Sequence, residues 1–129
     1  MRDTRGSRKD TLDRAPRRYC ILSPRAHARG LTIYGATLTP FEGANSFTPE
    51  REAKRQALNQ WIRTSRMYDA VIDFEAAVRD PAQPTKIRAM FDPGDHLHMN
   101  PAGYKAMADT IDLALFRAGS PSAPRTAAR

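Results

Sequence analysis

Two short apolar segments, separated by one long helical segment, constrain the fold of this chain most strongly. Residues 31–37 (LTIYGAT) and 70–74 (AVIDF) are rich in β-branched and aromatic residues and are short enough to be buried strands. Asp69 and Asp73 flank the centre of the second segment. Charged side chains at these positions indicate that they lie near the strand ends or that the strand lies at a sheet edge. Strand, helix, strand is the order of a parallel α/β unit. Two strands alone leave an open edge, so the sequence predicts part of a larger layered α/β sheet.

The long helix is predicted to begin after Thr48. Its hydroxyl can cap a helix, Pro49 suits the first helical position, and Glu50 is favoured near the positive end of the helix. Apolar residues then recur at three-to-four spacing and form one face: Ala53, Ala57, Leu58, Trp61 and Ile62. Polar residues lie off this face and are predicted to face water: Arg51, Lys54, Arg55 and Asn59. The apolar face requires a sheet or another helix to cover it.

Shorter elements are predicted around this unit. In RAHARG, Gly30 is expected to end a short helix, and Pro24 is expected to limit how far back that helix reaches. Residues 38–47 contain proline and glycine and read as a loop. Residues 75–80 (EAAVRD) can form a short helix before the prolines that follow.

The last helix repeats the start signal of the first. Asn100 followed by Pro101 predicts a cap and a first helical turn, and the helix is expected to run to about Phe116. Its predicted apolar face consists of Tyr104, Met107, Ala108, Ile111 and Leu115.

The basic charge is concentrated at the start of the chain. A length of 129 residues fits one domain. The chain carries a formal net charge of +7, and this charge is distributed unequally. Residues 1–29 hold nine Arg and Lys against three Asp, whereas residues 30–129 hold twelve against eleven acids. We therefore expect residues 1–24 to be a basic, disordered leader and residues 117–129 to be a disordered tail. Nucleic-acid binding through the leader is the less favoured alternative.

Several classes of protein are excluded or disfavoured by composition. Cys20 is the single cysteine, so neither an internal disulfide nor a thiolate metal cage can form within one chain. No segment approaches the roughly 18 apolar residues that span a bilayer, and the basic start lacks the apolar run of a secretory signal. The default expectation is a cytoplasmic chain without a cofactor.

Two of the three histidines lie in one loop, in GDHLHMNPAGYK (residues 94–105). Asp95 precedes His98 by three residues, so a tight turn can bring its carboxylate to one ring nitrogen while the other faces outward. That is the arrangement of a general base. Two alternatives remain open. Asp95 could merely cap the turn beside ordinary loop histidines, or Asp92, Asp95, His96 and His98 could bind a metal.

The same loop carries a family resemblance. GDHLHMNPAGYKAMADTIDLALF resembles the C-terminal signature of the SGNH (GDSL-type) esterase and lipase family, in which Asp-x-x-His precedes the last helix. RAHARGLTIYGATLTPFEG and WIRTSRMYDAVIDFEAAVRDP are similar to the segments that precede it in bacterial members. The resemblance covers about residues 25–116, as the C-terminal portion of an SGNH domain. It implies a three-layer α/β/α flavodoxin-like fold with a five-stranded parallel sheet, incomplete here, and hydrolysis of carboxylic esters.

The resemblance also implies residue roles. His98 matches the catalytic base and Asp95 the triad acid, whereas His96 has no assigned role. The family nucleophile lies in a Gly-Asp-Ser segment, with glycine and asparagine donors for the oxyanion from later loops, and these segments are missing from the sequence. The serines present do not follow a strand in that context: Ser7, Ser23, Ser46, Ser65, Ser120 and Ser122.

We therefore expect a truncated or mis-started fragment that carries the acid-base half of an ester hydrolase and is inactive alone. Each aliphatic side chain left in water forfeits roughly 1.5–3 kcal/mol, against a usual total stability of about 5–15 kcal/mol. The isolated chain should thus be marginally stable or dependent on a partner, with self-association through the open sheet edge as one outcome. The alternative function is a non-catalytic remnant or interaction module.

Overall fold

The computed structural model describes residues 21–117. The predicted leader therefore lies largely outside the described residues, and so does the predicted tail except for its first residue. The described elements follow the order predicted from sequence: β1 (Tyr34–Ala36), α2 (Pro49–Thr64), β2 (Ala70–Ile72), α3 (Phe74–Val78), the 3-10 helix η1 (Ala89–Phe91), α4 (Pro101–Asp109) and the 3-10 helix η2 (Leu113–Phe116).

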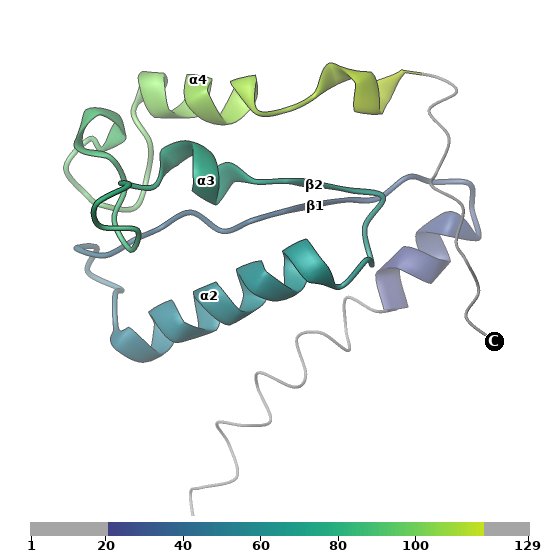
Figure 1. Ribbon diagram of the computed structural model, residues 1–129, viewed down its shortest axis with the longest axis horizontal. Helices are drawn as coiled ribbons and strands as arrows, with labels where there is room; N and C mark the ends of the chain where they lie inside the picture. The colour runs from purple at the N-terminus through teal and green to yellow at the C-terminus, as the bar shows by residue number, and fades with distance from the viewer. Residues whose placement is uncertain (1–20, 118–129) are drawn as a thin grey trace, which may run out of the picture.

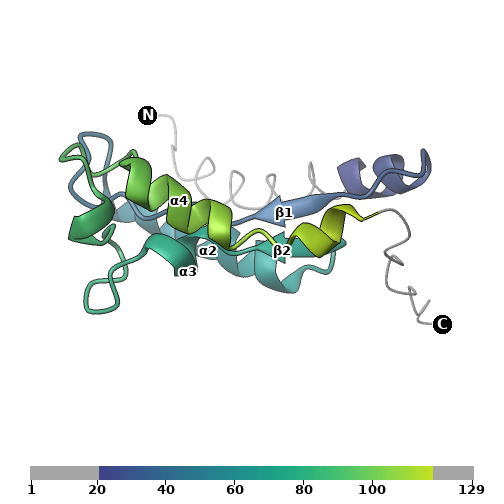
Figure 2. The ribbon, with the colours of Figure 1, turned by 90° about the horizontal axis from the view of Figure 1, so that it is seen from above.

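The two strands form a parallel sheet. Tyr34 lies opposite Ala70 and Ala36 opposite Ile72. Figure 1 places α2 along one side of this sheet and α4 with η2 along the other, and Figure 2 shows the same arrangement from above. The predicted α/β class with a parallel sheet is confirmed, and the sheet has two strands within the described residues, consistent with an incomplete α/β fold.

Both strands are shorter than predicted, because side chains take over the backbone groups at their ends. The N–H of Ile33, before β1, donates to Asp69 Oδ2 at 2.8 Å, and the N–H of Leu38, after β1, donates to Asn59 Oδ1 at 2.7 Å. At the end of β2, Asp73 leaves the strand and caps α3 by accepting the N–H of Ala76. Asp69 and Asp73 thus stand at the two ends of β2, as predicted.

Helix α2 begins as predicted but buries a different face. The N–H of Arg51 donates to the Thr48 hydroxyl at 3.2 Å, which confirms the cap. Ala53 and Ala57, predicted to be covered, are exposed. Ile62 of the predicted face is buried, and the other buried residues of the helix are Glu52, Arg55 and Asn59. The prediction that Arg55 and Asn59 face water was therefore wrong.

The buried polar residues of α2 are stabilised by ion pairs and hydrogen bonds with one another and with neighbouring segments. The guanidinium of Arg55 donates to Glu52 and to Glu75, each at 2.6 Å, and to the carbonyl of Leu38 at 3.0 Å. The Asn59 side chain makes two hydrogen bonds with the backbone of Leu38. Its Oδ1 accepts a hydrogen bond from the Leu38 N–H, and its Nδ2 donates to the Leu38 carbonyl at 2.8 Å. Hydrogen bonds of this kind remove the usual penalty for burying polar groups. We call Glu52, Arg55, Asn59 and Glu75 the α2 network.

Helix α4 starts where expected and stops early. Asn100 Oδ1 accepts the N–H of Gly103 at 3.0 Å. The helix ends at Asp109, because the Thr110 hydroxyl bonds back to the carbonyl of Met107 at 2.7 Å and the chain turns into η2. The predicted continuous helix to Phe116 was therefore wrong.

The predicted apolar face of α4 was also wrong in part. Tyr104 is 53% exposed, and Ala108 is exposed as well. Met107 packs against the buried cluster as predicted, Ala106 packs beside it, and Gly103 is buried. A Cβ at Gly103 would come within 2.9 Å of the Phe91 side chain, so the absence of a side chain lets α4 approach closely.

A small apolar cluster anchors the loop between η1 and α4. Its buried members are Val78, Ile87, Phe91 and Met99. Phe91 immediately precedes residues 92–98 and Met99 immediately follows them, so this loop is fixed at both ends. The N–H of Asn100 donates to the carbonyl of Phe91 at 2.8 Å and closes the base of the loop.

The first described segment is helical over residues 21–27, and Gly30 follows it with a φ of 69°. The predicted helix stop at Gly30 is confirmed. Pro24 does not limit this helix, since residues 21–23 are already helical. A proline in a helix lacks its N–H donor and its ring crowds the carbonyl four residues before it, yet residues 21–27 are helical here.

Large apolar side chains remain exposed over the described surface. They include Leu31 (58% exposed), Leu113 (73%) and Phe116 (59%). Among the described helices there is no segment with the length and hydrophobicity to cross a bilayer.

Candidate active site

Residues 92–98, which we call the site loop, lie at the carboxyl end of the parallel strands. Gly43, in the segment that follows β1, packs against this loop, and a Cβ on Gly43 would meet the His96 ring at 2.9 Å. In Figure 1 this end of the molecule lies opposite the helical residues 21–27. The carboxyl ends of parallel strands are where α/β sheets usually place ligands.

Asp95 and His98 form the predicted pair. Asp95 Oδ2 lies 2.6 Å from His98 Nδ1, while Oδ1 accepts the N–H groups of Leu97 and His98, each at 3.0 Å. One carboxylate therefore caps the turn and holds the imidazole at the same time. Oδ1 makes the capping contacts of the first alternative, and Oδ2 contacts the His98 ring.

The pair is open to solvent and electrostatically polarised. The side chains of His98 and Asp95 are 66% and 49% exposed. The hydrogen bond from His98, followed by the two backbone N–H donors, lowers the pKa of Asp95 to about 2. Asp95 is thus ionised at neutral pH and accepts a hydrogen bond from the Nδ1–H of the neutral ring, which leaves Nε2 without a proton and able to act as the base. Within the described residues, no protein group is hydrogen-bonded to Nε2.

A second pair lies beside the first. Asp92 Oδ2 is 2.5 Å from His96 Nδ1, and Asp92 Oδ1 accepts the N–H groups of Gly94 and His96. Burial raises the pKa of Asp92, but these hydrogen bonds outweigh it and the net shift is downward. His96 has a φ of 58°, a left-handed conformation that is uncommon for a residue with a side chain. Neither the pairing of Asp92 with His96 nor the contact between Gly43 and the His96 ring was predicted from the sequence.

The four residues considered as metal ligands divide into these two separate pairs. Among residues 21–117, no group of three or more histidine, cysteine or acidic side chains converges in a way that could hold a metal ion. Each Nδ1 is instead occupied by its own carboxylate.

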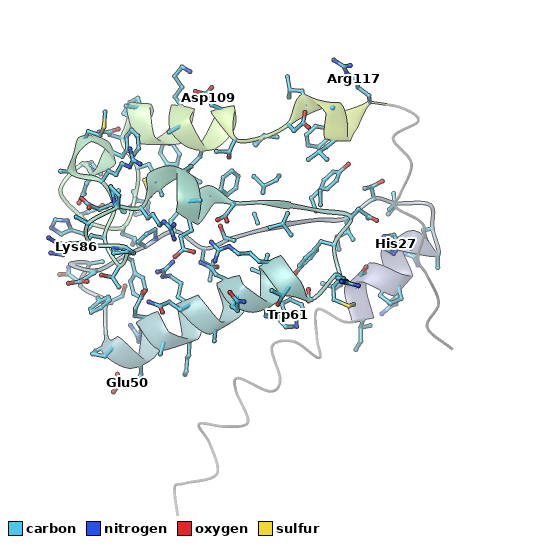
Figure 3. The ribbon with its side chains drawn as sticks, in the orientation of Figure 1. His27, Glu50, Trp61, Lys86, Asp109 and Arg117 are labelled. Atoms are coloured by element: carbon cyan, nitrogen blue, oxygen red, sulfur yellow. The ribbon has the colours of Figure 1, made fainter. Side chains whose placement is uncertain are left out.

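The third histidine also has a carboxylate partner, at the opposite end of the sheet. His27 Nε2 lies 2.8 Å from Asp69 Oδ2, and its Nδ1 lies 3.4 Å from Ser23 Oγ. Figure 3 shows His27 far from Lys86, which lies at the site-loop end of the molecule. Ser23 is fully buried, so a substrate cannot reach its hydroxyl. This arrangement fastens helical residues 21–27 to the start of β2.

The described serines leave the Asp95–His98 pair without a hydroxyl partner. Ser23, Ser46 and Ser65 lie within residues 21–117, and His98 is hydrogen-bonded to none of them.

The comparison with protein families gives a match over most of the chain. A family model described as "GDSL-like Lipase/Acylhydrolase family" matches residues 7–106. This range includes both strands, α2, α3, the site loop and the start of α4, and it also takes in part of the segment before residue 25. A search of the curated proteins finds no match.

Proposed function

Because this chain belongs to the GDSL-like lipase/acylhydrolase family, we propose that it carries the acid-base half of a serine ester hydrolase, with His98 as base and Asp95 as its orienting acid. Family membership supports the general assignment as a hydrolase-like domain, and hydrolysis of carboxylic esters is the reaction class that we propose for it. The assignment of the two residues rests on the geometry of the site loop.

The observation that carries the proposal is that the two oxygens of the Asp95 carboxylate have different partners. Asp95 Oδ1 is fixed by two backbone N–H groups, so Oδ2 is presented to His98 Nδ1 at 2.6 Å in one orientation. A general base needs a fixed tautomer and a partner that stabilises the imidazolium, and this geometry supports both needs.

In the proposed reaction, His98 Nε2 accepts the proton of a serine hydroxyl while the serine oxygen bonds to the ester carbonyl carbon. The imidazolium is stabilised by Asp95, then gives the proton to the departing alcohol. A water molecule repeats the sequence and releases the carboxylic acid. The serine must come from outside the described residues.

We infer that the 129-residue chain alone has no useful esterase activity. General-base assistance without a nucleophile contributes only about 10²–10⁴ in rate, and the sequence contains no Gly-Asp-Ser segment. Hydrolysis of a short-chain aryl ester by the purified chain that disappears in His98→Ala would contradict this inference.

Diethyl pyrocarbonate tests the base without a nucleophile, because it acylates unprotonated imidazole nitrogen. We expect His98 to be modified faster than His96, as followed by mass spectrometry of peptides. Asp95→Asn is the matched control, since it keeps the side-chain size and removes the charge. If His98 is no longer modified faster than His96 in Asp95→Asn, the proposal is supported. If His98 reacts at the same rate in the variant as in the unmodified chain, the proposal is contradicted.

Self-association is a second candidate property. Within the described residues β1 pairs with β2 alone, so one of its edges is open, and Leu31 just before it is 58% exposed. An open edge beside apolar side chains favours pairing with another chain. Sedimentation at several concentrations tests this, and a monomer at all of them would contradict it.

A further inference from the structure

An open groove lies beside the Asp95–His98 pair and is not used by the proposed proton transfer. Its volume is about 390 Å³, within the range of sites that bind small molecules. It runs between the first turns of α2, the segment after β1 and the site loop. Four apolar side chains line it: Leu38, Phe41, Leu58 and Leu97.

The groove adjoins the proposed base through Leu97, the residue immediately before His98. Leu97 is 44% exposed and Leu38, across the groove, is 46% exposed. Covering such side chains with an aliphatic ligand removes apolar surface from water, which stabilises a complex by about 25 cal/mol per Å². A ligand chain in the groove would therefore have one end near His98.

Two cations line the groove and form no ion pair with a carboxylate of residues 21–117. Arg51 donates to the carbonyl of Ser46 at 2.6 Å, which is a neutral acceptor. Lys54 also lines the groove and forms no ion pair with another described residue. Arg55, in contrast, is compensated by two glutamates. Among the described residues that line the groove, the charge left without an ion-pair partner is thus positive.

We propose that this groove binds the aliphatic chain of an ester that also carries a carboxylate, with that carboxylate near Lys54 and Arg51. The inference rests on the proposed function and names its substrate class. Apolar walls select the aliphatic chain, and the two cations select an anion over a neutral or cationic ligand of the same length.

Octanoate is the probe, because it joins an eight-carbon chain to a carboxylate and needs no catalysis. Binding to the 129-residue chain is followed by amide NMR shifts, with octanol and octyltrimethylammonium as ligands of equal chain length. We expect saturable shifts at Leu58 and Leu97 with octanoate, weaker binding of octanol and the weakest binding of the cation.

Two variants with matched controls locate the site. Lys54→Glu should weaken octanoate binding about tenfold, whereas Lys105→Glu, the same change on the exposed face of α4, should not. Leu97→Ala should weaken it about fivefold, whereas Leu113→Ala, at a 73% exposed leucine of η2, should leave it unchanged.

Binding that is insensitive to both groove variants, or equal for octanoate and octyltrimethylammonium, would overturn the proposal. The same titration in His98→Ala separates this inference from the proposed function. Octanoate binding should persist there, because His98 does not line the groove. Failure of the groove would leave the reactivity of His98 unaffected, and failure of His98 as a base would leave the groove intact.

Discussion

The α2 network and the Asp95–His98 pair both join a carboxylate to a nitrogen at 2.6 Å, yet they differ in almost every other respect. The side chain of Arg55 is 4% exposed and has two glutamates and a carbonyl as partners. The side chain of His98 is 66% exposed and is hydrogen-bonded to Asp95 alone among residues 21–117. The first arrangement fixes the scaffold, and the second leaves most of the imidazole in solvent.

This difference teaches where substitutions should act. Removing a member of a buried network leaves a charge that water cannot reach, whereas removing an exposed partner lets water take its place. The network should control stability, and the exposed pair should control chemistry.

The largest effect is expected from Arg55→Ala. It leaves the buried carboxylate of Glu52 without its cation, so the free energy of unfolding should fall by about 3–5 kcal/mol. Urea unfolding followed by circular dichroism measures the change. Arg51→Ala is the matched control, an exposed arginine on the same helix, with an expected loss under about 1 kcal/mol. Equal losses in the two variants would break the comparison.

Gly43→Ala should have the next largest effect. Gly43 has a φ of 102°, and an added Cβ would lie 2.9 Å from the His96 ring. We expect a loss of about 1–3 kcal/mol in unfolding free energy. In a His96→Ala background the part due to the ring should disappear and the backbone part should remain. An identical loss with and without the ring would show that the two segments do not touch.

The third largest effect is expected from acid, which should lower the free energy of unfolding by protonating Asp73. Asp73 accepts two hydrogen bonds from Arg63, each at 2.8 Å, and these lower its pKa to about 2. The unfolded value is about 3.9, so this stabilisation is fully present above about pH 4 and is lost as the pH falls through 2. Asp73→Asn should flatten the fall in unfolding free energy between those values. Asp109→Asn, at an exposed carboxylate of α4, should leave it unchanged.

The smallest effect on stability is expected at the proposed base. His98→Ala should change the unfolding free energy by no more than about 0.5 kcal/mol, because the ring is exposed and its neighbours stay hydrated. Thermal unfolding of the variant beside the unmodified chain measures this. A loss of several kcal/mol would mean that His98 serves the fold rather than the chemistry.

The sequence predicted the order of elements well, because the signals were local. Thr48 and Asn100 cap their helices where a side-chain acceptor precedes a proline, and Asp95 lies beside His98 because three residues suffice for the turn. These features depend on a few neighbouring residues and can be read without knowing what packs against them.

The buried face of α2 could not be predicted from hydrophobic periodicity. Arg55 and Asn59 are buried because Glu75, which is distant in sequence, and the backbone of Leu38 supply their partners. The i, i+3 spacing of Glu52 and Arg55 was the available signal, but that spacing is also common on exposed helices. The Gly43–His96 contact was hidden for the same reason, since it joins segments that only the fold brings together.

The central claim is that Asp95 holds His98 in the tautomer of a general base. Nitrogen-15 NMR of the histidine side chains at neutral pH measures that tautomer directly, in the unmodified chain and in Asp95→Asn. The neutral His98 ring should carry its proton on Nδ1 and leave Nε2 bare, and the preference should disappear when the carboxylate is replaced. A proton on Nε2 in the unmodified chain, or the same tautomer in both proteins, would contradict the claim.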